Sequence, residues 1–221
     1  MVVQMYNKGR KLPVIAIVNQ KGGTGKTTLS INLASAFAES FRTLLLDADP
    51  QGSALDWAES RTEAQMNLDA RELQAGGLIQ DVRALARDYD WVIIDGPPGI
   101  SRTSAEAVRA ADIVLIPCKP SPFDVWAAAD IVAAVQARQK ATGGVPRAYF
   151  VVTMARPRTR LYTQVNTALA EYGMSALSAR TTERVSYPTT AIEGRSVIDS
   201  RDAAAQREIL AIRDEILEKS E

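Results

Sequence analysis

Residues 20–28 read Gln-Lys-Gly-Gly-Thr-Gly-Lys-Thr-Thr, and this stretch decides the fold. The apolar run Val14–Val18 before it predicts a buried strand. After it, Leu29, Leu33 and Phe37 recur at the four-residue spacing of one helix face. A glycine-rich turn between a strand and a helix is the context of a phosphate-binding loop, or P-loop. The stretch therefore predicts a strand, a P-loop and a helix in succession.

The residue types in this loop explain how it would hold phosphate. Gly22, Gly23 and Gly25 let the backbone curl so that its N–H groups point toward phosphate oxygens. The positive end of the following helix acts at the same place. Lys26 is placed to reach the β- and γ-phosphates, and the Thr27 hydroxyl to bind Mg²⁺. The expected nucleotide-binding residues are Gly22, Gly23, Thr24, Gly25, Lys26, Thr27 and Thr28.

The loop departs from the ordinary P-loop motif at its start. That motif has a glycine where this chain has Gln20, and here Lys21 precedes the glycine pair. The arrangement K-G-G-x-G-K-T-T resembles the deviant Walker A box of the ParA/MinD family of ATPases. In that family the lysine that Lys21 matches crosses to the partner subunit and touches its nucleotide phosphates. The resemblance implies an ATP-bound homodimer, with Lys21 and Lys26 as catalytic residues.

Two carboxylates lie at the end of the next expected strand, residues 43–47. Asp47 and Asp49 stand at i and i+2, so they leave the strand end on the same side. Ligands bind at the carboxyl ends of parallel strands, so the two carboxylates are candidates for a binding site. The alternative interpretation of the same residues is a solvated Asp-Pro turn. By resemblance to the family's D-x-D-P-Q segment, called Walker A′, Asp47 lies near Mg²⁺ and Asp49 orients the attacking water.

A third carboxylate, Asp95, follows the apolar run 91–94. A carboxylate at a buried strand end is costly unless it is paired or faces a cation, so we expect Asp95 to bind Mg²⁺ as the Walker B residue. An aspartate in a tight turn is the alternative. Residues 96–101 would then form a switch that senses the γ-phosphate. The chain has no histidine, so hydrolysis must rest on positioning and charge neutralisation, and the family's slow turnover suits a switch-like ATPase.

Apolar runs alternate with amphipathic stretches along the rest of the chain. Strands are expected at 14–18, 43–47, 91–95, 112–117 and 148–153, and helices at 102–110, 123–141, 161–172 and from about 203. This alternation predicts an α/β fold, a mostly parallel twisted sheet with helices on both faces. The expected organisation is a short flexible lead over residues 1–12 and a single P-loop NTPase domain over residues 13–221.

Composition narrows the function classes. The 221 residues suffice for one well-buried domain, and Lys plus Arg equals Asp plus Glu at 26 each, so net charge favours no partner. With Cys118 as the single cysteine and no histidine, an intrachain disulfide and the usual zinc or iron–sulfur sites are excluded. Residues 1–12 lack the apolar stretch of a signal peptide, so a cytoplasmic protein is expected.

Three later segments extend the resemblance over most of the chain. Pro120–Asp124 resembles the corresponding segment of short, ParF-like partition ATPases. Met154–Arg158 lies where the family places its nucleotide-base contacts, which makes Met154 a candidate base contact. Residues 191–199 resemble the family's late A-x-x-x-G-x-x-[VI]-x-D stretch. The resemblance thus implies the short ParA partition or positioning subgroup.

The function implied is a ParA-type positioning ATPase. Its ATP dimer would bind DNA without sequence preference through phosphate contacts, at the nucleoid, and a ParB-like or cargo-adaptor protein would stimulate hydrolysis. The cargo could be a plasmid, a chromosome or a protein complex. Arg201, Arg207 and Arg213 are candidate DNA contacts. Arginines interleaved with acidic residues on one helix are also typical of a solvated, ion-paired face, so both interpretations stand.

Three other functions are weighed against this one. A MinD-like membrane ATPase is disfavoured because the acidic end, residues 215–221, would be repelled by anionic lipid. A metabolic enzyme on the same scaffold could be an amidoligase, or an electron carrier like nitrogenase reductase. The carrier needs paired cysteines, which Cys118 does not supply. A GTPase lacks its Asn-Lys-x-Asp motif, since Asn7-Lys8 is followed by Gly-Arg.

Overall fold

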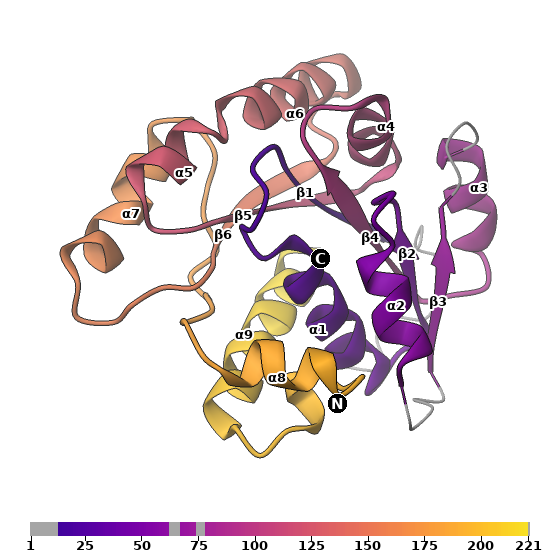
Figure 1. The fold of residues 1–221 in the computed structure, drawn as a ribbon. Helices are drawn as coiled ribbons and strands as arrows, with labels where there is room; N and C mark the ends of the chain where they lie inside the picture. The colour runs from indigo at the N-terminus through magenta and orange to yellow at the C-terminus, as the bar shows by residue number, and fades with distance from the viewer. Residues whose placement is uncertain (1–12, 62–66, 74–77, 221) are drawn as a thin grey trace.

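Among the residues that the structure describes, six parallel strands form one sheet in the order β3-β2-β4-β1-β5-β6 (Figure 1). The computed structural model describes residues 13–61, 67–73 and 78–220, so the expected lead over residues 1–12 lies outside the described residues. The strands are β1 (Val14–Asn19), β2 (Thr43–Asp47), β3 (Leu68–Glu72), β4 (Trp91–Pro98), β5 (Ile113–Cys118) and β6 (Arg147–Val152). The expected parallel α/β fold of a P-loop NTPase is confirmed.

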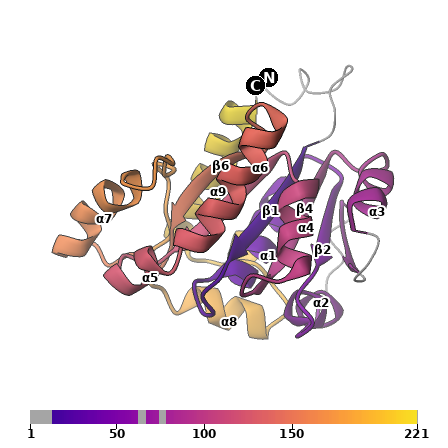
Figure 2. The same ribbon diagram turned by 90° about the horizontal axis from the view of Figure 1, so that it is seen from above.

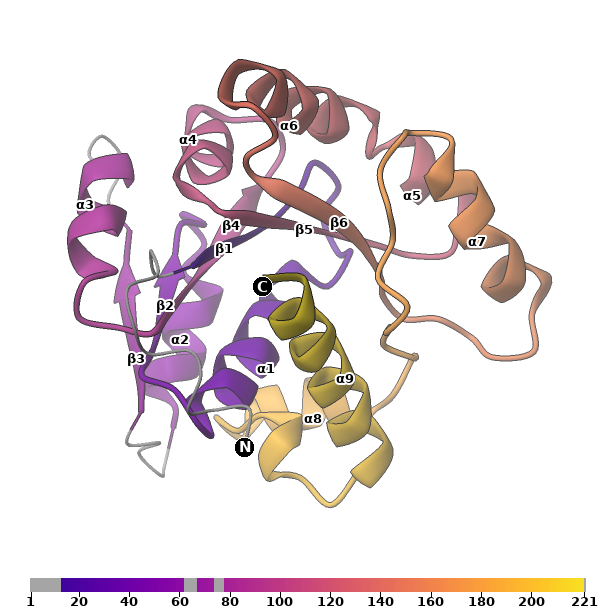
Figure 3. The same cartoon turned by 180° about the vertical axis from the view of Figure 1, so that it is seen from behind.

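Helices cover both faces of the sheet because side chains alternate along each buried strand. On β1, Ile15 and Ile17 face one helical layer, whereas Val14, Ala16 and Val18 face the other. Figure 2 shows the layers from above, and Figure 3 shows the far side. The first layer holds α1 (Lys26–Ala38), α2 (Ser53–Glu59), α8 (Ser186–Ile192), the 3-10 turn η2 (Val197–Asp199) and α9 (Ala203–Ser220). The second holds α3 (Leu78–Leu85), α4 (Arg102–Ala110), α5 (Pro122–Trp126), α6 (Ala129–Thr142) and α7 (Arg160–Ala170).

The expected helix over residues 123–141 is wrong as a single element. The structure divides it into α5 and α6, with a turn at Ala127 and Ala128. The Ala128 N–H donates to Val125 O, three residues back, whereas the Val132 N–H donates four residues back to Ala128 O. The chain therefore tightens by one turn with a three-residue hydrogen bond at Ala128, a small residue that is fully buried in the core.

The strand containing Asp95 is longer than expected. β4 continues through Gly96 and Pro97 to Pro98, and Asn19 of β1 pairs with Pro98 across a register shift. The segment expected as a switch, residues 96–101, is therefore partly held in the sheet. In the part of the chain that the structure describes, no helix combines the length and the apolar character that a membrane crossing requires.

Candidate functional site

The glycine-rich loop lies at the carboxyl end of β1, in the middle of the sheet. From β1 the chain crosses toward β2 on one side, whereas β5 follows on the other, so the loop stands at a topological switch point. Gly23 and Gly25 adopt φ angles of 69° and 89°. These left-handed conformations are strained for other residues, which explains glycine at both positions. α1 begins directly after Gly25, at Lys26.

Lys26 is buried at the floor of the loop. Its Nζ donates to Lys21 O at 3.4 Å. Burial lowers the pKa of Lys26, and the nearby carboxylates of Asp95 and Asp49 oppose this effect. A buried ammonium group can bind the phosphate anion, and the carboxylates close by can face the cation that accompanies it.

The loop is also fastened to the end of β6. The Thr153 Oγ1 donates to Thr24 O at 2.7 Å. A Cβ added at Gly25 would lie 3.5 Å from the Met154 Cε, so the predicted base contact does lie against the loop. Met154 itself has a φ of 51°, uncommon for a residue other than glycine. Unusual backbone of this kind clusters at functional sites.

Asp95 is fully buried at the base of the site. Its Oδ1 accepts a hydrogen bond of 2.7 Å from Ser30 Oγ, while its Oδ2 has no hydrogen-bond partner among the described residues. Burial raises the pKa of Asp95 to about 7, against the opposing effect of the Ser30 and Thr27 hydroxyls. A buried carboxylate oxygen without a donor, beside the Thr27 hydroxyl, fits a cation such as Mg²⁺.

Asp47 occupies the register position next to Asp95 but is differently engaged. Its Oδ1 accepts from the Asp49 N–H at 3.0 Å. Its Oδ2 accepts from the N–H groups of Ala54 and Leu55 at 2.8 and 3.1 Å, at the start of α2. Burial raises the pKa of Asp47, and these three hydrogen bonds work against the rise. Asp47 thus shapes the turn that carries Asp49, a role that the sequence analysis missed.

A cation here would draw few ligands from the protein. Within the described residues, no group of three or more His, Cys, Asp or Glu side chains is placed to hold a metal ion. Mg²⁺ usually binds through one or two protein groups, phosphate oxygens and water, so this arrangement fits it. Asp49 is half-exposed at the rim, where its Oδ1 accepts from the Gln51 N–H at 3.0 Å.

Lys21 points to a carboxylate of its own chain. Its Nζ lies 2.9 Å from the Oδ2 of Asp124, a buried residue of α5. The Asp124 Oδ1 is buried without a hydrogen-bond partner among the described residues. The motif identified Lys21, but its partner lies 103 residues away and only the tertiary fold reveals the pair.

The segment after Asp95 touches the loop directly. The Gly99 N–H donates to Gln20 O at 2.8 Å. Gly96 has no room for a side chain, because a Cβ there would lie 2.7 Å from Val18 Cγ1 and 2.8 Å from Ile17 O. A displacement of the loop at Gln20 would therefore act directly on residues 99–101, because the two segments are hydrogen-bonded to each other.

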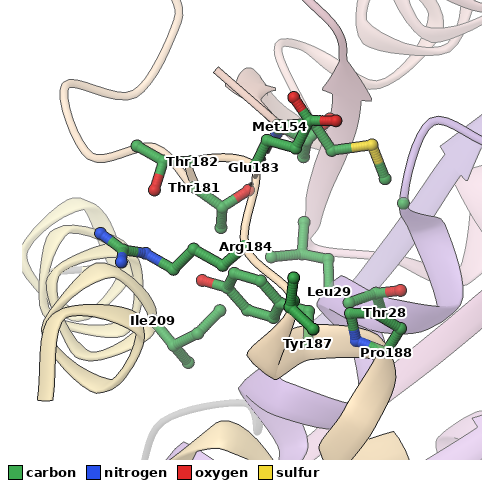
Figure 4. A pocket seen from close by; sticks show the side chains of 13 residues that line it. Thr28, Leu29, Met154, Thr181, Thr182, Glu183, Arg184, Tyr187, Pro188 and Ile209 are labelled. Carbon is green, nitrogen blue, oxygen red and sulfur yellow. Dashed lines mark hydrogen bonds between the residues drawn. The ribbon is translucent and has the colours of Figure 1, made fainter. Parts of the chain in front are cut away.

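A cavity of about 530 Å³ opens beside the loop. In Figure 4, Met154 and Thr28 lie on its loop side, and Arg184 and Ile209 on the side of α9. Its volume is within the range of small-ligand sites. It is lined by Gly25, Thr28, Leu29, Thr153, Met154, Thr181, Thr182, Glu183, Arg184, Val185, Tyr187, Pro188 and Ile209.

The three candidate DNA-contacting arginines differ in their surroundings. Arg213 is engaged: it lies 2.9 Å from a carboxylate oxygen of Glu39, pairs with Asp214 and donates to Ala36 O. Arg201 and Arg207 are exposed, and in the described structure neither side chain has a hydrogen bond or an ion pair. The ion-paired interpretation holds for Arg213 and not for the other two.

The parallel sheet, the switch-point loop and the cavity beside it define a P-loop nucleotide-binding protein. A family model described as CobQ/CobB/MinD/ParA nucleotide binding domain matches residues 15–197, and the chain belongs to this family.

Named relatives and a solved structure agree with this assignment. The chain is 34% identical over 195 residues to "Maintenance of carboxysome distribution protein A" of Gloeobacter kilaueensis, covering 87% of each chain. It is 32% identical over 196 residues to "Chromosome-partitioning ATPase Soj" of Thermus thermophilus, covering 74% of this chain and 78% of the relative. Apo McdA from Cyanothece superposes with a TM-score of 0.82 at 18% identity, over 92% of this chain and 99% of that one, which supports the fold.

Proposed function

We propose that this chain is a ParA-type ATPase that dimerises on ATP, binds DNA without sequence preference and positions a cargo by partner-stimulated hydrolysis. The observation that carries the proposal is a second lysine, Lys21, at the mouth of the nucleotide loop in a chain of this family. The names of the relatives favour a positioning role, with a protein complex or a chromosome as the cargo. The protein would work in the cytoplasm on the nucleoid.

The triphosphate would lie over residues 22–28, with Lys26 beneath the β- and γ-phosphates. Thr27 and the unpartnered oxygen of Asp95 would hold Mg²⁺, whose positive charge offsets charge on the phosphates. Asp47 would act through the turn it holds, and Asp49 would orient the attacking water from the rim. These positions supply electrostatic stabilisation without an imidazole base.

The base would occupy the cavity beside Met154. The lining is largely apolar at Leu29, Met154 and Ile209, as expected for a surface that receives a flat ring. Adenine is the base we propose, because the relative Soj of Thermus thermophilus is named as an ATPase.

The dimer surface would surround Lys21. For Lys21 to reach a partner's phosphates, its ion pair with Asp124 must open. Phe123 and Trp126 flank Asp124, are 70% and 65% exposed, and pack edge to face with ring centroids 5.6 Å apart. Clustered exposed aromatic rings are typical of protein–protein interfaces.

DNA would contact the exposed arginines Arg201 and Arg207, beside and on α9. Phosphate contacts of this kind are independent of sequence and weaken as salt rises. A dimer presents each arginine twice, so ATP would raise DNA affinity by joining two weak surfaces.

The test is retention on a nonspecific DNA duplex with ADP, with ATP, and with ATP for Lys21→Ala. We expect retention only with ATP, and loss of it in the variant. Lys140→Ala, which removes an exposed lysine of α6, is the matched control and should behave like the wild type. ATP-dependent dimers without DNA retention would refute the nucleoid role and favour a membrane or metabolic function. Phosphate release in the same samples measures ATPase activity.

A further inference from the structure

One wall of the cavity is bonded to the end of β6 on one side and to α9 on the other. After α7 the chain runs beside β6 with isolated bridges at Phe150–Ala176 and Ala155–Thr182 and does not continue as a strand. From Thr181 onward this segment lines the cavity. On its inner side the segment is bonded to the end of β6, where the Thr181 N–H donates to Val152 O at 3.0 Å and the Glu183 N–H to Ala155 O at 3.1 Å. A separate set of contacts fixes its outer side.

That outer side is held by Glu208 of α9. Its Oε1 accepts from Thr182 Oγ1 at 2.6 Å and from Arg184 Nε at 3.0 Å. Its Oε2 accepts from the Thr182 N–H at 3.0 Å and from the Tyr187 hydroxyl at 2.9 Å. All three donor residues line the cavity, whereas Glu208 does not. One carboxylate thus fastens three lining residues to α9.

The chemistry of these hydrogen bonds suits a fixed wall. The Glu208 side chain is half-buried, and hydrogen bonds to a carboxylate are stronger than those between neutral groups. Burial, with the adjacent Glu208 carboxylate, raises the pKa of Tyr187, so this hydroxyl remains a donor at all ordinary pH values. Asp202 adds a bond from Ser186 Oγ at 2.8 Å, next to the same wall.

Glu215 on the same helix provides an internal comparison. Its two oxygens accept from the N–H groups of Ser178 and Ala179 at 3.1 and 2.9 Å. It therefore holds the same segment to α9, but neither Ser178 nor Ala179 lines the cavity. Glu215 is similarly buried, but it accepts two hydrogen bonds from the segment where Glu208 accepts four, and it holds a part of the segment outside the cavity.

We propose that Glu208 is a positioning residue for nucleotide recognition: it sets the wall formed by Thr182, Arg184 and Tyr187 and thereby the affinity for the base. The inference rests on the proposed function, since it takes the base to lie in this cavity. Glu208 acts through the wall and leaves the phosphate loop unchanged. Loss of Glu208 should therefore lower the affinity for ligands that carry a base and leave the affinity for ligands with phosphates alone unchanged.

The experiment titrates the full-length wild type, Glu208→Ala, Glu208→Gln and Glu215→Ala with Mg·ATP, Mg·GTP and Mg²⁺ plus inorganic tripolyphosphate. For Glu208→Ala we expect ATP affinity to fall by about tenfold or more, as for loss of charge-assisted bonds, and the ratio of ATP to GTP affinity to shrink. Tripolyphosphate affinity should stay within about twofold. Glu208→Gln keeps one carbonyl acceptor, so its ATP affinity should lie between those of the wild type and Glu208→Ala.

Thermal unfolding separates this role from general destabilisation. Glu215→Ala should also lower the unfolding temperature, because two backbone N–H groups lose their acceptor, while leaving ATP affinity near that of the wild type. Equal losses of ATP affinity in the two alanine variants, or an equal loss of tripolyphosphate affinity in Glu208→Ala, would overturn the inference and leave the proposed function standing. A wild type that binds no nucleotide would overturn both.

Discussion

Two buried aspartates at matching register positions illustrate how one residue type serves two purposes. Asp47 satisfies its oxygens with three backbone N–H groups, whereas Asp95 leaves one oxygen without a donor among the described residues. A carboxylate whose oxygens are hydrogen-bonded stabilises the local structure. A buried carboxylate oxygen without a donor destabilises the folded state, and a bound cation can remove this destabilisation. The two positions thus differ in what each makes available to a ligand.

The cost at Asp95 predicts a pH-dependent stability. Its pKa is near 7 in the folded protein and near 3.8 otherwise, so the folded state holds the extra proton between these values. Stability of the ligand-free protein should therefore fall as pH rises from about 4 to about 7. Asp95→Asn removes this dependence, and its stability relative to the wild type should rise by on the order of 3 kcal/mol from pH 5 to pH 8. Denaturant unfolding at both pH values measures it, and an unchanged difference would contradict the assignment.

Gly96 gives a second prediction at the scale of one residue. In Gly96→Ala the new Cβ would lie 2.7 Å from Val18 Cγ1 and 2.8 Å from the backbone oxygen of Ile17. A backbone atom within the sheet cannot move aside, so we expect a loss of about 1–3 kcal/mol in unfolding free energy. Gly22→Ala is the control, because a Cβ at Gly22 meets no atom within 4 Å. Comparable losses in the two variants of the ligand-free protein would refute the steric argument.

At the scale of elements, the sequence predicted those that carry motifs or long apolar runs. β1, β2 and α4 begin and end close to where periodicity placed them. β3 was missed because its sequence, Leu-Asp-Ala-Arg-Glu, is polar, as an edge strand permits, and only Leu68 is buried. α2 and α8 are single short helices with little periodic pattern. The pairs Lys21–Asp124 and Thr182–Glu208 join distant residues, so local patterns could not reveal them.

The arginines on and beside α9 give a prediction for that element. Arg201→Glu with Arg207→Glu should lower ATP-dependent DNA retention at low salt by about tenfold or more, since each phosphate contact releases counterions. Stability should change by no more than about 0.5 kcal/mol, because both side chains are exposed. Arg213→Glu should mainly lower stability and change DNA retention less. The variant loses the partners Glu39 and Ala36 O, and it places a new carboxylate beside that of Glu39. DNA retention that survives the double variant would place the DNA surface elsewhere.

At the scale of the whole molecule, the proposed functions gather at one edge of the sheet. The phosphate loop, the Lys21–Asp124 pair and the exposed rings of Phe123 and Trp126 all follow carboxyl ends of strands. Val145, also exposed and apolar, precedes β6 and so lies at the opposite edge. A dimer that closes over two nucleotides would bury the first edge and leave the second in solvent.

This arrangement predicts which apolar residues dimerisation uses. Phe123→Ser with Trp126→Ser should weaken the ATP-dependent dimer by about tenfold or more, because interface aromatic residues carry a large share of binding energy. The rings are 70% and 65% exposed, so the monomer should keep its unfolding free energy within about 0.5 kcal/mol and its affinity for ATP. Val145→Ser, at 44% exposure, is the matched control and should dimerise as the wild type does. Sedimentation velocity with ADP and with ATP provides the measurement. A double variant that dimerises normally would place the dimer interface away from α5. The proposal that Lys21 leaves Asp124 to bind the partner's phosphates would then be contradicted.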